Sequence, residues 1–237
     1  MKTFAAHAAA FALTNLAASV AAQASDAPLP NLDAIYAVSW SGLGVGDAAV
    51  SLRADAQAGC YVYASTTKPV GFIKALYGSP NESSRFCVQG GRIRSQHFES
   101  VLEGDDKQSY TLAFDYAKHQ VTDENGLSRE IPDEAVDSFS LQQAVRLWAA
   151  AHAKDENPPI GEFTMVDRKN FTYYKFKFAG HETLQTPAGT FETMKIERVD
   201  NPDKIGRFWL APERDYMPVR IETKNGGKPA LVLSLKK

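Results

Sequence analysis

The sequence predicts a mainly β protein, built as one highly curved antiparallel sheet or open β-barrel of about a dozen strands with one short and one longer helix. Polar and apolar residues alternate with a period of two along most of the chain. Short turn sequences rich in Gly, Asn and Asp separate the alternating runs, which favours antiparallel neighbours. A sheet with this many strands normally curls or closes.

The strands are predicted from apolar side chains that recur on one face of each alternating run. One-sided alternation suits an antiparallel sheet with one face on a core. The glycines of Gly42–Gly46 are interpreted as a hairpin connection, because the run after them is a strand and a dinucleotide motif would need a helix there. The clearest apolar faces are Tyr36/Val38/Trp40, Ala48/Val50/Leu52, Tyr61/Tyr63, Tyr110/Leu112/Phe114/Tyr116, Tyr174/Phe176/Phe178, Val219/Ile221 and Leu231/Leu233/Leu235.

Two segments break the period of two and predict the helices. The stretch Pro69–Gly78 has apolar residues at helical spacing between a proline suited to a first turn and a glycine suited to a stop. The longer helix follows Ser140, which with Gln143 forms a capping-box pattern, and it ends before Pro158-Pro159. This helix divides two β-rich halves, which we assign to a single domain, residues 25–237.

The N-terminal residues predict export. Lys2 precedes an Ala-rich run without Asp or Glu, and Ala22-Gln23-Ala24 has the small-x-small pattern of a cleavage site. Residues 1–24 are therefore interpreted as a signal peptide, and a soluble periplasmic protein is expected. The run is too polar for a good membrane span, and no other long apolar run predicts one.

Cys60 and Cys87 are the only two cysteines of the chain. An even number in an exported protein favours a disulfide. Such a bridge stabilises by roughly 3 kcal/mol, because it restricts the unfolded chain. The alternative is a reactive thiol, which needs an activating base, and the sequence shows none nearby.

Charge and motif content argue against several function classes. Without residues 1–24 and their one Lys, 25 basic and 28 acidic side chains give a formal charge of −3, scattered along the chain, so no nucleic-acid partner is expected. The histidines lack the spacing of metal ligands, and acidic turns such as Asp123-Glu124 lack a calcium-loop pattern. No cofactor, metal site or catalytic residue is assigned.

Aromatic residues provide the candidate binding site. Sheets that curl around one or two helices can enclose an apolar cavity, and aromatic side chains on the inner face would line it. A filled aromatic core is the alternative, and the sequence leaves both open. The candidate ligand-binding residues are Tyr61, Tyr63, Phe72, Ile73, Leu76, Tyr77, Trp148 and Phe176.

Six stretches, in order along the chain, resemble the bacterial secreted family known as domain of unknown function 3108. They are YAVSWSGLGVGDAAVSL, VQGGRIRSQHF, YTLAFDYAKHQV, DSFSLQQAVRLW, TPAGTFETMKIER and FWLAPERDYMPVRIE. The resemblance covers about Ala34 to Leu235. It implies a periplasmic protein with a curved antiparallel sheet akin to the open barrels of periplasmic lipoprotein carriers, and it brings no activity or catalytic residues. The cysteine pair departs from the family pattern.

Three functions follow as hypotheses. The first is a non-enzymatic periplasmic protein that binds or carries an apolar or amphipathic, lipid-like ligand in maintenance of the cell envelope. The second is an envelope structural or protein-interaction module with a solid core. The third is an enzyme of unfamiliar type, for which His97 with Arg92 or Arg94 is a weak candidate, because His97 and Arg94 face opposite sides of a strand.

Overall fold

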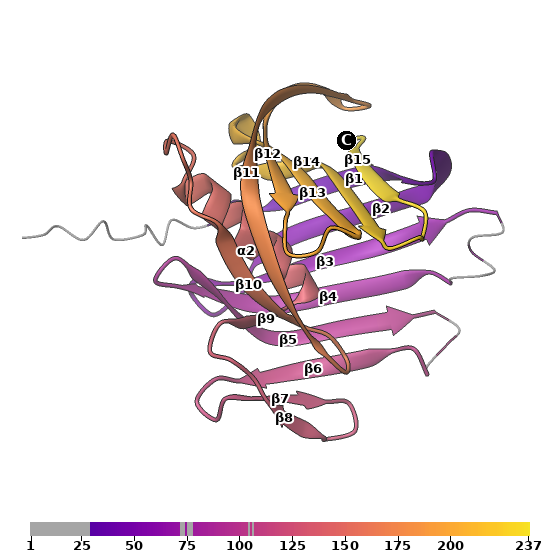
Figure 1. The fold of residues 1–237 in the computed structure, drawn as a ribbon. Coiled ribbons are helices and arrows are strands. Elements are labelled where there is room, and N and C mark those ends of the chain that lie inside the picture. Colours follow the sequence, from indigo (N-terminus) through magenta and orange to yellow (C-terminus); the bar gives the residue numbers. More distant parts are fainter. Residues whose placement is uncertain (1–28, 72–73, 75–77, 104, 106) are drawn as a thin grey trace, which may run out of the picture.

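One curved sheet forms most of the protein in the computed structural model, which describes residues 29–71, 74, 78–103, 105 and 107–237 (Figure 1). Fifteen strands pair in the order β8-β7-β6-β5-β4-β3-β2-β1-β15-β14-β13-β12-β11-β10-β9, and the sheet does not close. The predicted curved, mainly β fold is confirmed. The predicted signal peptide, residues 1–24, lies outside the described residues, as do Phe72, Ile73, Leu76 and Tyr77 of the predicted short helix.

The first half of the sheet is an antiparallel meander in which each strand pairs with the next. Its last strands have only three or four residues, too few to show a period in the sequence, which explains why about a dozen strands were expected. The strands are β1 (Leu32–Trp40), β2 (Leu43–Ala54), β3 (Cys60–Pro69), β4 (Pro80–Gln89), β5 (Arg92–Leu102), β6 (Tyr110–Asp115), β7 (Gln120–Asp123) and β8 (Ser128–Glu130).

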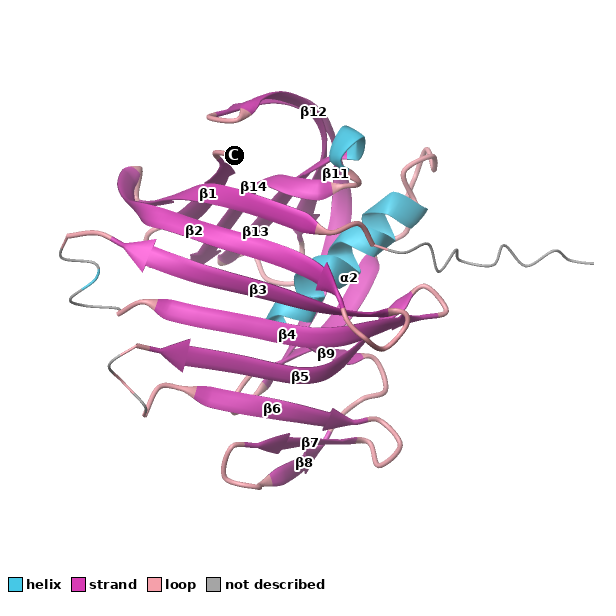
Figure 2. Cartoon of the chain, turned by 180° about the vertical axis from the view of Figure 1, so that it is seen from behind, coloured by secondary structure: helices cyan, strands magenta, loops and turns pink. Residues whose placement is uncertain are grey.

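A helix then crosses the hollow of the sheet and connects two strands that pair with each other. The strands β9 and β10 run parallel, which corrects the expectation of an entirely antiparallel sheet. Parallel neighbours need a long crossover, and α2 supplies it. Figure 2 shows α2 lying across β3, β4 and β5, all of which it contacts. The elements are β9 (Ala135–Asp137), α2 (Ser138–Ala151) and β10 (Gly161–Val166).

The second half is another antiparallel meander, and its last strand pairs with β1 to join the two halves. Because β1 and β15 take each other as neighbours, neither leaves an open edge in the middle of the sheet. The elements are β11 (Phe171–Thr186), β12 (Gly189–Arg198), β13 (Lys204–Ala211), the 3₁₀ turn η1 (Pro212–Arg214), β14 (Met217–Asn225) and β15 (Leu231–Leu235).

Glycine at two positions allows close packing next to the interior. A Cβ on Gly161 of β10 would lie 2.9 Å from the indole of Trp148, so only glycine lets α2 approach this strand. A Cβ on Gly46 of β2 would lie 2.3 Å from the carbonyl oxygen of Lys68, and Gly46 has a φ of +146°. Gly46 belongs to a bulge rather than to the predicted hairpin connection, since only Ser41-Gly42 turn the chain before β2.

The long hairpin of β11 and β12 curls over one end of the sheet (Figure 1). Its tip has a two-residue turn at Pro187-Ala188, and the irregularity in pairing falls between Phe178 and His181. The amide of Ala188 donates to the carbonyl of Leu235 at 3.1 Å, so the tip is attached to β15. The conspicuous PAG sequence is therefore a structural turn that docks on the last strand.

Side chains link the β7–β8 end of the open sheet to the start of β11. Arg168, in the turn before β11, forms an ion pair with Glu124 beyond β7 and donates to the carbonyl of Lys107 at 2.7 Å. The guanidinium of Arg129 on β8 lies 5.3 Å from the centre of the Phe171 ring on β11. These contacts link the two ends of the open sheet without strand pairing. In the described part of the chain, no helix is both long and apolar enough to cross a bilayer.

Candidate ligand-binding cavity

A cavity of about 750 Å³ lies between the inner face of the sheet and the start of α2. This volume is within the roughly 300–1,000 Å³ typical of small-molecule sites. Its walls come from β1, β2, β3, β4, β14, β15 and α2. The lining residues are Tyr36, Val38, Trp40, Val45, Ala48, Val50, Tyr63, Ser65, Thr67, Pro69, Gly78, Pro80, Glu82, Phe139, Gln142, Ile221, Thr223, Lys224, Asn225, Lys228, Pro229, Leu231 and Leu233.

The apolar walls follow from strand periodicity. Alternate residues of a strand face the same side, so Tyr36, Val38 and Trp40 of β1 all reach the cavity. The pairing of β1 with β2 shifts between Val38 and Ser39, which leaves Val45 as the extra residue on β2. Val45 is buried and packs with Val38 and Ala48, which adds apolar surface near the open end.

Two tyrosines and the first turns of α2 form the inner end of the cavity. The Tyr36 hydroxyl donates to the carbonyl of Pro218 at 2.6 Å, and the Tyr63 hydroxyl donates to Oε1 of Gln142 at 3.2 Å. The Tyr63 ring packs on Phe139 with a centroid distance of 5.4 Å. Burial raises the pKa of Tyr63 to about 12, and it raises the pKa of Tyr36 as well, so both phenols remain neutral hydrogen-bonding groups.

A buried arginine supports this inner end from α2. The Nε of Arg146 donates to the carbonyl of Asp215 at 2.7 Å, and its Nη1 donates to Gln143 at 3.2 Å. Asp215 and Tyr216 both have left-handed backbone, with φ of 51° and 59°, in the turn after η1. Burial lowers the pKa of Arg146, and the nearby Asp215 carboxylate opposes that effect. Arg146 thus ties α2 to the turn before β14.

Glu82 adds a carboxylate to the inward face of β4, whose other residues are apolar or carry a hydroxyl. It has the same strand parity as the fully buried Ser84 and Phe86, so its side chain faces inward and lines the cavity. Its cross-strand partners are Ser65 on β3 and Ser100 on β5. Burial raises the pKa of Glu82, a hydrogen bond from Ser100 lowers it, and the charge of Asp137 raises it.

A second inward carboxyl, Asp137, caps α2 and is completely buried. Its Oδ1 accepts from the amides of Phe139 and Ser140, both at 2.8 Å, and its Oδ2 accepts from the hydroxyls of Ser84 and Ser140 at 2.7 and 2.8 Å. The Asp137 amide donates to Ser95 Oγ at 3.0 Å. The N-cap is therefore Asp137 rather than the predicted Ser140, and it ties the helix to β4 and β5.

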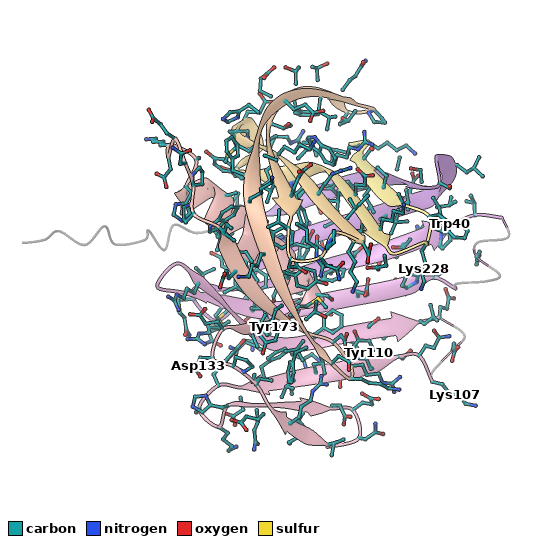
Figure 3. All side chains as sticks on the ribbon, viewed as in Figure 1. Trp40, Lys107, Tyr110, Asp133, Tyr173 and Lys228 are labelled. Carbon is teal, nitrogen blue, oxygen red and sulfur yellow. A yellow bond between two sulfur atoms is a disulfide. The ribbon has the colours of Figure 1, made fainter. Side chains whose placement is uncertain are left out.

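The mouth of the cavity is more polar than its inner end. Thr223, Lys224 and Asn225 end β14, and Lys228 lies in the exposed turn that leads to β15. Lys228 and Trp40 lie at the same end of the sheet (Figure 3). Neither lysine side chain forms an ion pair with the residues that the structure describes. An apolar interior below a polar rim suits an amphipathic molecule.

The predicted ligand-binding residues occupy different environments. Tyr63 lines the cavity. Tyr61 stacks on Phe86 with a centroid distance of 5.7 Å, and its hydroxyl accepts from the amide of Leu29 at 2.9 Å. Phe176 and Trp148 pack in the core around β10 and β11 rather than along the cavity wall. Phe72, Ile73, Leu76 and Tyr77 lie outside the described residues.

Several lining residues were missed because their role depends on neighbours distant in the sequence. Glu82 looks like a solvated surface residue when it is taken alone. A usable signal exists, since Glu82 is two and four residues from Ser84 and Phe86, on the inward face of β4. Phe139 and Gln142 could be assigned to the cavity only after α2 was placed against β3 and β4.

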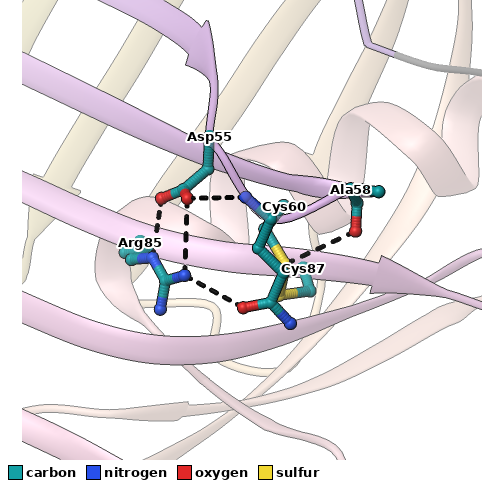
Figure 4. The surroundings of a disulfide bond; sticks show 6 residues. Asp55, Ala58, Cys60, Arg85 and Cys87 are labelled. Carbon is teal, nitrogen blue, oxygen red and sulfur yellow. Dashed lines mark hydrogen bonds and ion pairs between the residues drawn. A yellow bond between two sulfur atoms is a disulfide. The ribbon is translucent and has the colours of Figure 1, made fainter.

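Cys60 and Cys87 are direct cross-strand partners on β3 and β4 and form a disulfide (Figure 4). Beside them, Arg85 forms an ion pair with Asp55 at 2.7 Å and donates to Gln57 Oε1 at 3.0 Å. The bridge and these contacts hold the loop between β2 and β3 against β4. The predicted disulfide is present in the structure, and it stabilises the wall that carries Glu82.

The candidate enzyme residues His97, Arg92 and Arg94 do not form a common site. His97 is exposed on the outer side of β5, while Arg92 pairs with Glu134 and the Arg94 guanidinium lies 4.8 Å from the centre of the Tyr116 ring. These groups do not converge with His97 on a cleft. Among the described residues, no group of three or more His, Cys, Asp or Glu side chains is arranged to hold a metal ion.

Comparison with known proteins identifies relatives by family and by fold. The family model described as "Protein of unknown function (DUF3108)" matches residues 35–230. A search of curated proteins finds no match.

Two of the solved structures that match this chain have low sequence identity to it. A β-barrel-like protein of the domain of unknown function DUF1849 from Brucella abortus has a TM-score of 0.54 and 10% identity, over 87% of this chain and 96% of that one. A Bacteroides fragilis protein with a YmcC-like fold has a TM-score of 0.39 and 15% identity, over 88% of this chain and 96% of that one. At 10% identity, the Brucella protein shows a shared barrel-like fold alone.

Proposed function

The chain belongs to the DUF3108 family, and we propose that it is a periplasmic protein that binds or carries an apolar or amphipathic, lipid-like ligand in the cell envelope. The observation that carries this proposal is the cavity of about 750 Å³ with an aromatic inner end and a polar mouth. An apolar pocket with a few convergent polar groups is the usual form of a small-molecule site. The hollow also argues against a module with a solid core.

Export is the second part of the proposal. Residues 1–24 have the pattern of a signal peptide, and the Cys60–Cys87 disulfide is a bond that persists in oxidising compartments such as the periplasm. A single domain over residues 25–237 would carry the cavity. Cell fractionation of the full chain tests this part: we expect processed protein in the periplasmic fraction, and unprocessed protein in the cytosol would contradict it.

Ligand binding is tested with the fluorescent apolar probe N-phenyl-1-naphthylamine and the processed protein, residues 25–237. Thr67 of β3 lines the cavity, and Thr66 is exposed on the opposite face of the same strand. In Thr67→Trp the indole narrows the mouth, so we expect at least about tenfold weaker probe binding, equal to about 1.4 kcal/mol. The matched variant Thr66→Trp should bind the probe as the unchanged protein does.

Two results would overturn the proposed binding function. One is equal probe binding by Thr67→Trp and Thr66→Trp, which would place the probe elsewhere. The other is absence of any amphiphile from native mass spectra of protein purified from its periplasm, together with no probe binding. Circular dichroism and the melting temperature of both variants show that the sheet has folded, so loss of binding is not mistaken for unfolding.

A further inference from the structure

We propose that Glu82 is the charge-recognition residue of the cavity, and that the ligand is an amphiphile whose ammonium group pairs with this carboxylate. The inference rests on the proposed binding function and names the chemical class of the ligand. It is carried by the position of Glu82 in the cavity wall, by the absence of a cation paired with it among the described residues, and by the aromatic side chains around the same space.

The Glu82 carboxylate faces the cavity without a basic partner in the described chain. The groups that act on it are the Ser100 hydroxyl on β5 and the Asp137 carboxyl, and the Tyr110 phenol on β6 is close enough to interact with its charge. Ser65 lies opposite it on β3 and is uncharged. No described Lys or Arg forms an ion pair with Glu82. Glu82 is half-buried. A carboxylate partly removed from water is stabilised by a cation or by several donors, so this one has capacity for a ligand donor.

Aromatic rings in the same cavity add to the attraction for a cation. Tyr36, Trp40, Tyr63 and Phe139 all line it. The faces of such rings are electronegative and attract an ammonium group, most strongly when both are removed from water. A carboxylate and aromatic rings therefore favour a cation in this space and disfavour an anion, while the apolar walls of β1 and β2 suit the hydrocarbon part of the molecule.

The two lysines at the mouth are less suited than Glu82 to set the charge preference of the ligand. Lys224 and Lys228 line the same cavity from β14 and the turn after it, and neither forms an ion pair with Glu82. Lys228 is exposed to water, where pairing with an anion contributes little. Glu82 is half-buried in the wall, where pairing has a larger effect than at a fully exposed position. Head-group selectivity should therefore follow Glu82.

Isothermal titration below the critical micelle concentration tests the proposal with four ligands that share a twelve-carbon chain. These are dodecylamine, dodecyltrimethylammonium, dodecanol and dodecanoate. We expect dodecylamine to bind at least about tenfold more tightly than dodecanol, with dodecyltrimethylammonium between them because it has charge but no N–H donor. Dodecanoate should bind most weakly. In Glu82→Gln the preference for the two cations should disappear while dodecanol binding is retained.

Glu99→Gln is the matched control. Glu99 is exposed on the outer face of β5, beside the partner of Glu82, and this variant should keep the preference for cations. Tighter binding of dodecanoate than of dodecylamine would assign selectivity to Lys224 and Lys228 and overturn the proposal. Equal affinity for all four ligands, or an unchanged preference in Glu82→Gln, would also overturn it while leaving the proposed binding function intact. No binding of any ligand would reject both.

Discussion

Two inward-facing carboxyls of this protein, Asp137 and Glu82, differ in how completely their oxygens are satisfied. Asp137 is fully buried and accepts four hydrogen bonds, two from backbone amides and two from serine hydroxyls. Glu82 lines the cavity and is hydrogen bonded by the hydroxyl of Ser100. Burial raises the pKa of both carboxyls, as expected for charge removed from water.

The difference separates a structural carboxyl from one that retains free bonding capacity. The four donors around Asp137 offset its burial and connect α2 to β4 and β5, so loss of that side chain leaves donors unsatisfied. Glu82 connects no elements beyond its neighbouring strand, and its burial is not offset to the same extent. Binding sites often contain an ionisable group whose burial lowers the stability of the fold.

The largest effect is expected for Asp137→Ala. Removal of the carboxylate leaves two amides and one of the two serine hydroxyls without an acceptor inside the protein, since Ser84 and Ser140 can bond only to each other. We therefore expect a loss of about 3 kcal/mol in the free energy of unfolding. Urea denaturation followed by circular dichroism measures it. Asp137→Asn retains one acceptor oxygen and should lose less. If Asp137→Ala is as stable as the unchanged protein, Asp137 does not hold the helix in place.

A smaller loss is expected for Ser84→Ala, which removes one donor to Asp137 and one contact with Ser140. We expect a decrease of about 1–2 kcal/mol in unfolding free energy, the usual effect of removing one hydrogen bond to a buried charged group. Ser83, the preceding residue on β4, faces the other side of the strand, so Ser83→Ala is the control. Equal destabilisation by the two variants would show that the network around Asp137 contributes no more than the strand itself.

The smallest effect, and the only gain, is expected for Glu82→Gln. A neutral amide in the cavity wall avoids the cost of a buried charge, so the variant should be more stable by about 1 kcal/mol at pH 7 in the absence of ligand. Thermal unfolding of the unchanged protein, Glu82→Gln and Glu99→Gln measures this. Destabilisation by Glu82→Gln would mean that Glu82 has a stabilising partner beyond Ser100, and would remove the contrast with Asp137.

The pH dependence of that gain follows from the raised pKa of Glu82. A carboxyl whose pKa is higher in the folded than in the unfolded state binds more protons when folded, so it lowers stability as pH rises from the unfolded pKa through the folded one. The stability advantage of Glu82→Gln should therefore be full at neutral pH and should decline as pH falls through the folded pKa of Glu82. An advantage that grows on acidification would contradict the assigned direction.

The alternation of side chains along a strand predicts which residues share a face, and this is the part of the site that the sequence reveals. The faces Tyr36/Val38/Trp40 and Tyr61/Tyr63 were assigned correctly to strands, because alternation is a local property. Tyr63 and Tyr61 nevertheless differ in the structure, one in the cavity wall and one stacked on Phe86. Position along the strand decides this, since α2 fills one end of the hollow and leaves the other open, and the sequence does not place the helix.

The sequence by itself determined the period-two strands, the short turns between them, the long helix and the cysteine pair, because each depends on residues close together or on a count. Tertiary structure alone decided that β9 pairs parallel with β10, that β15 closes on β1, and that Glu82 faces a cavity. These features depend on contacts between segments up to about two hundred residues apart. The physical reason is that the burial of a side chain depends on the segments that pack over it. For Glu82, no Lys or Arg of the described chain lies in an ion pair with its carboxylate.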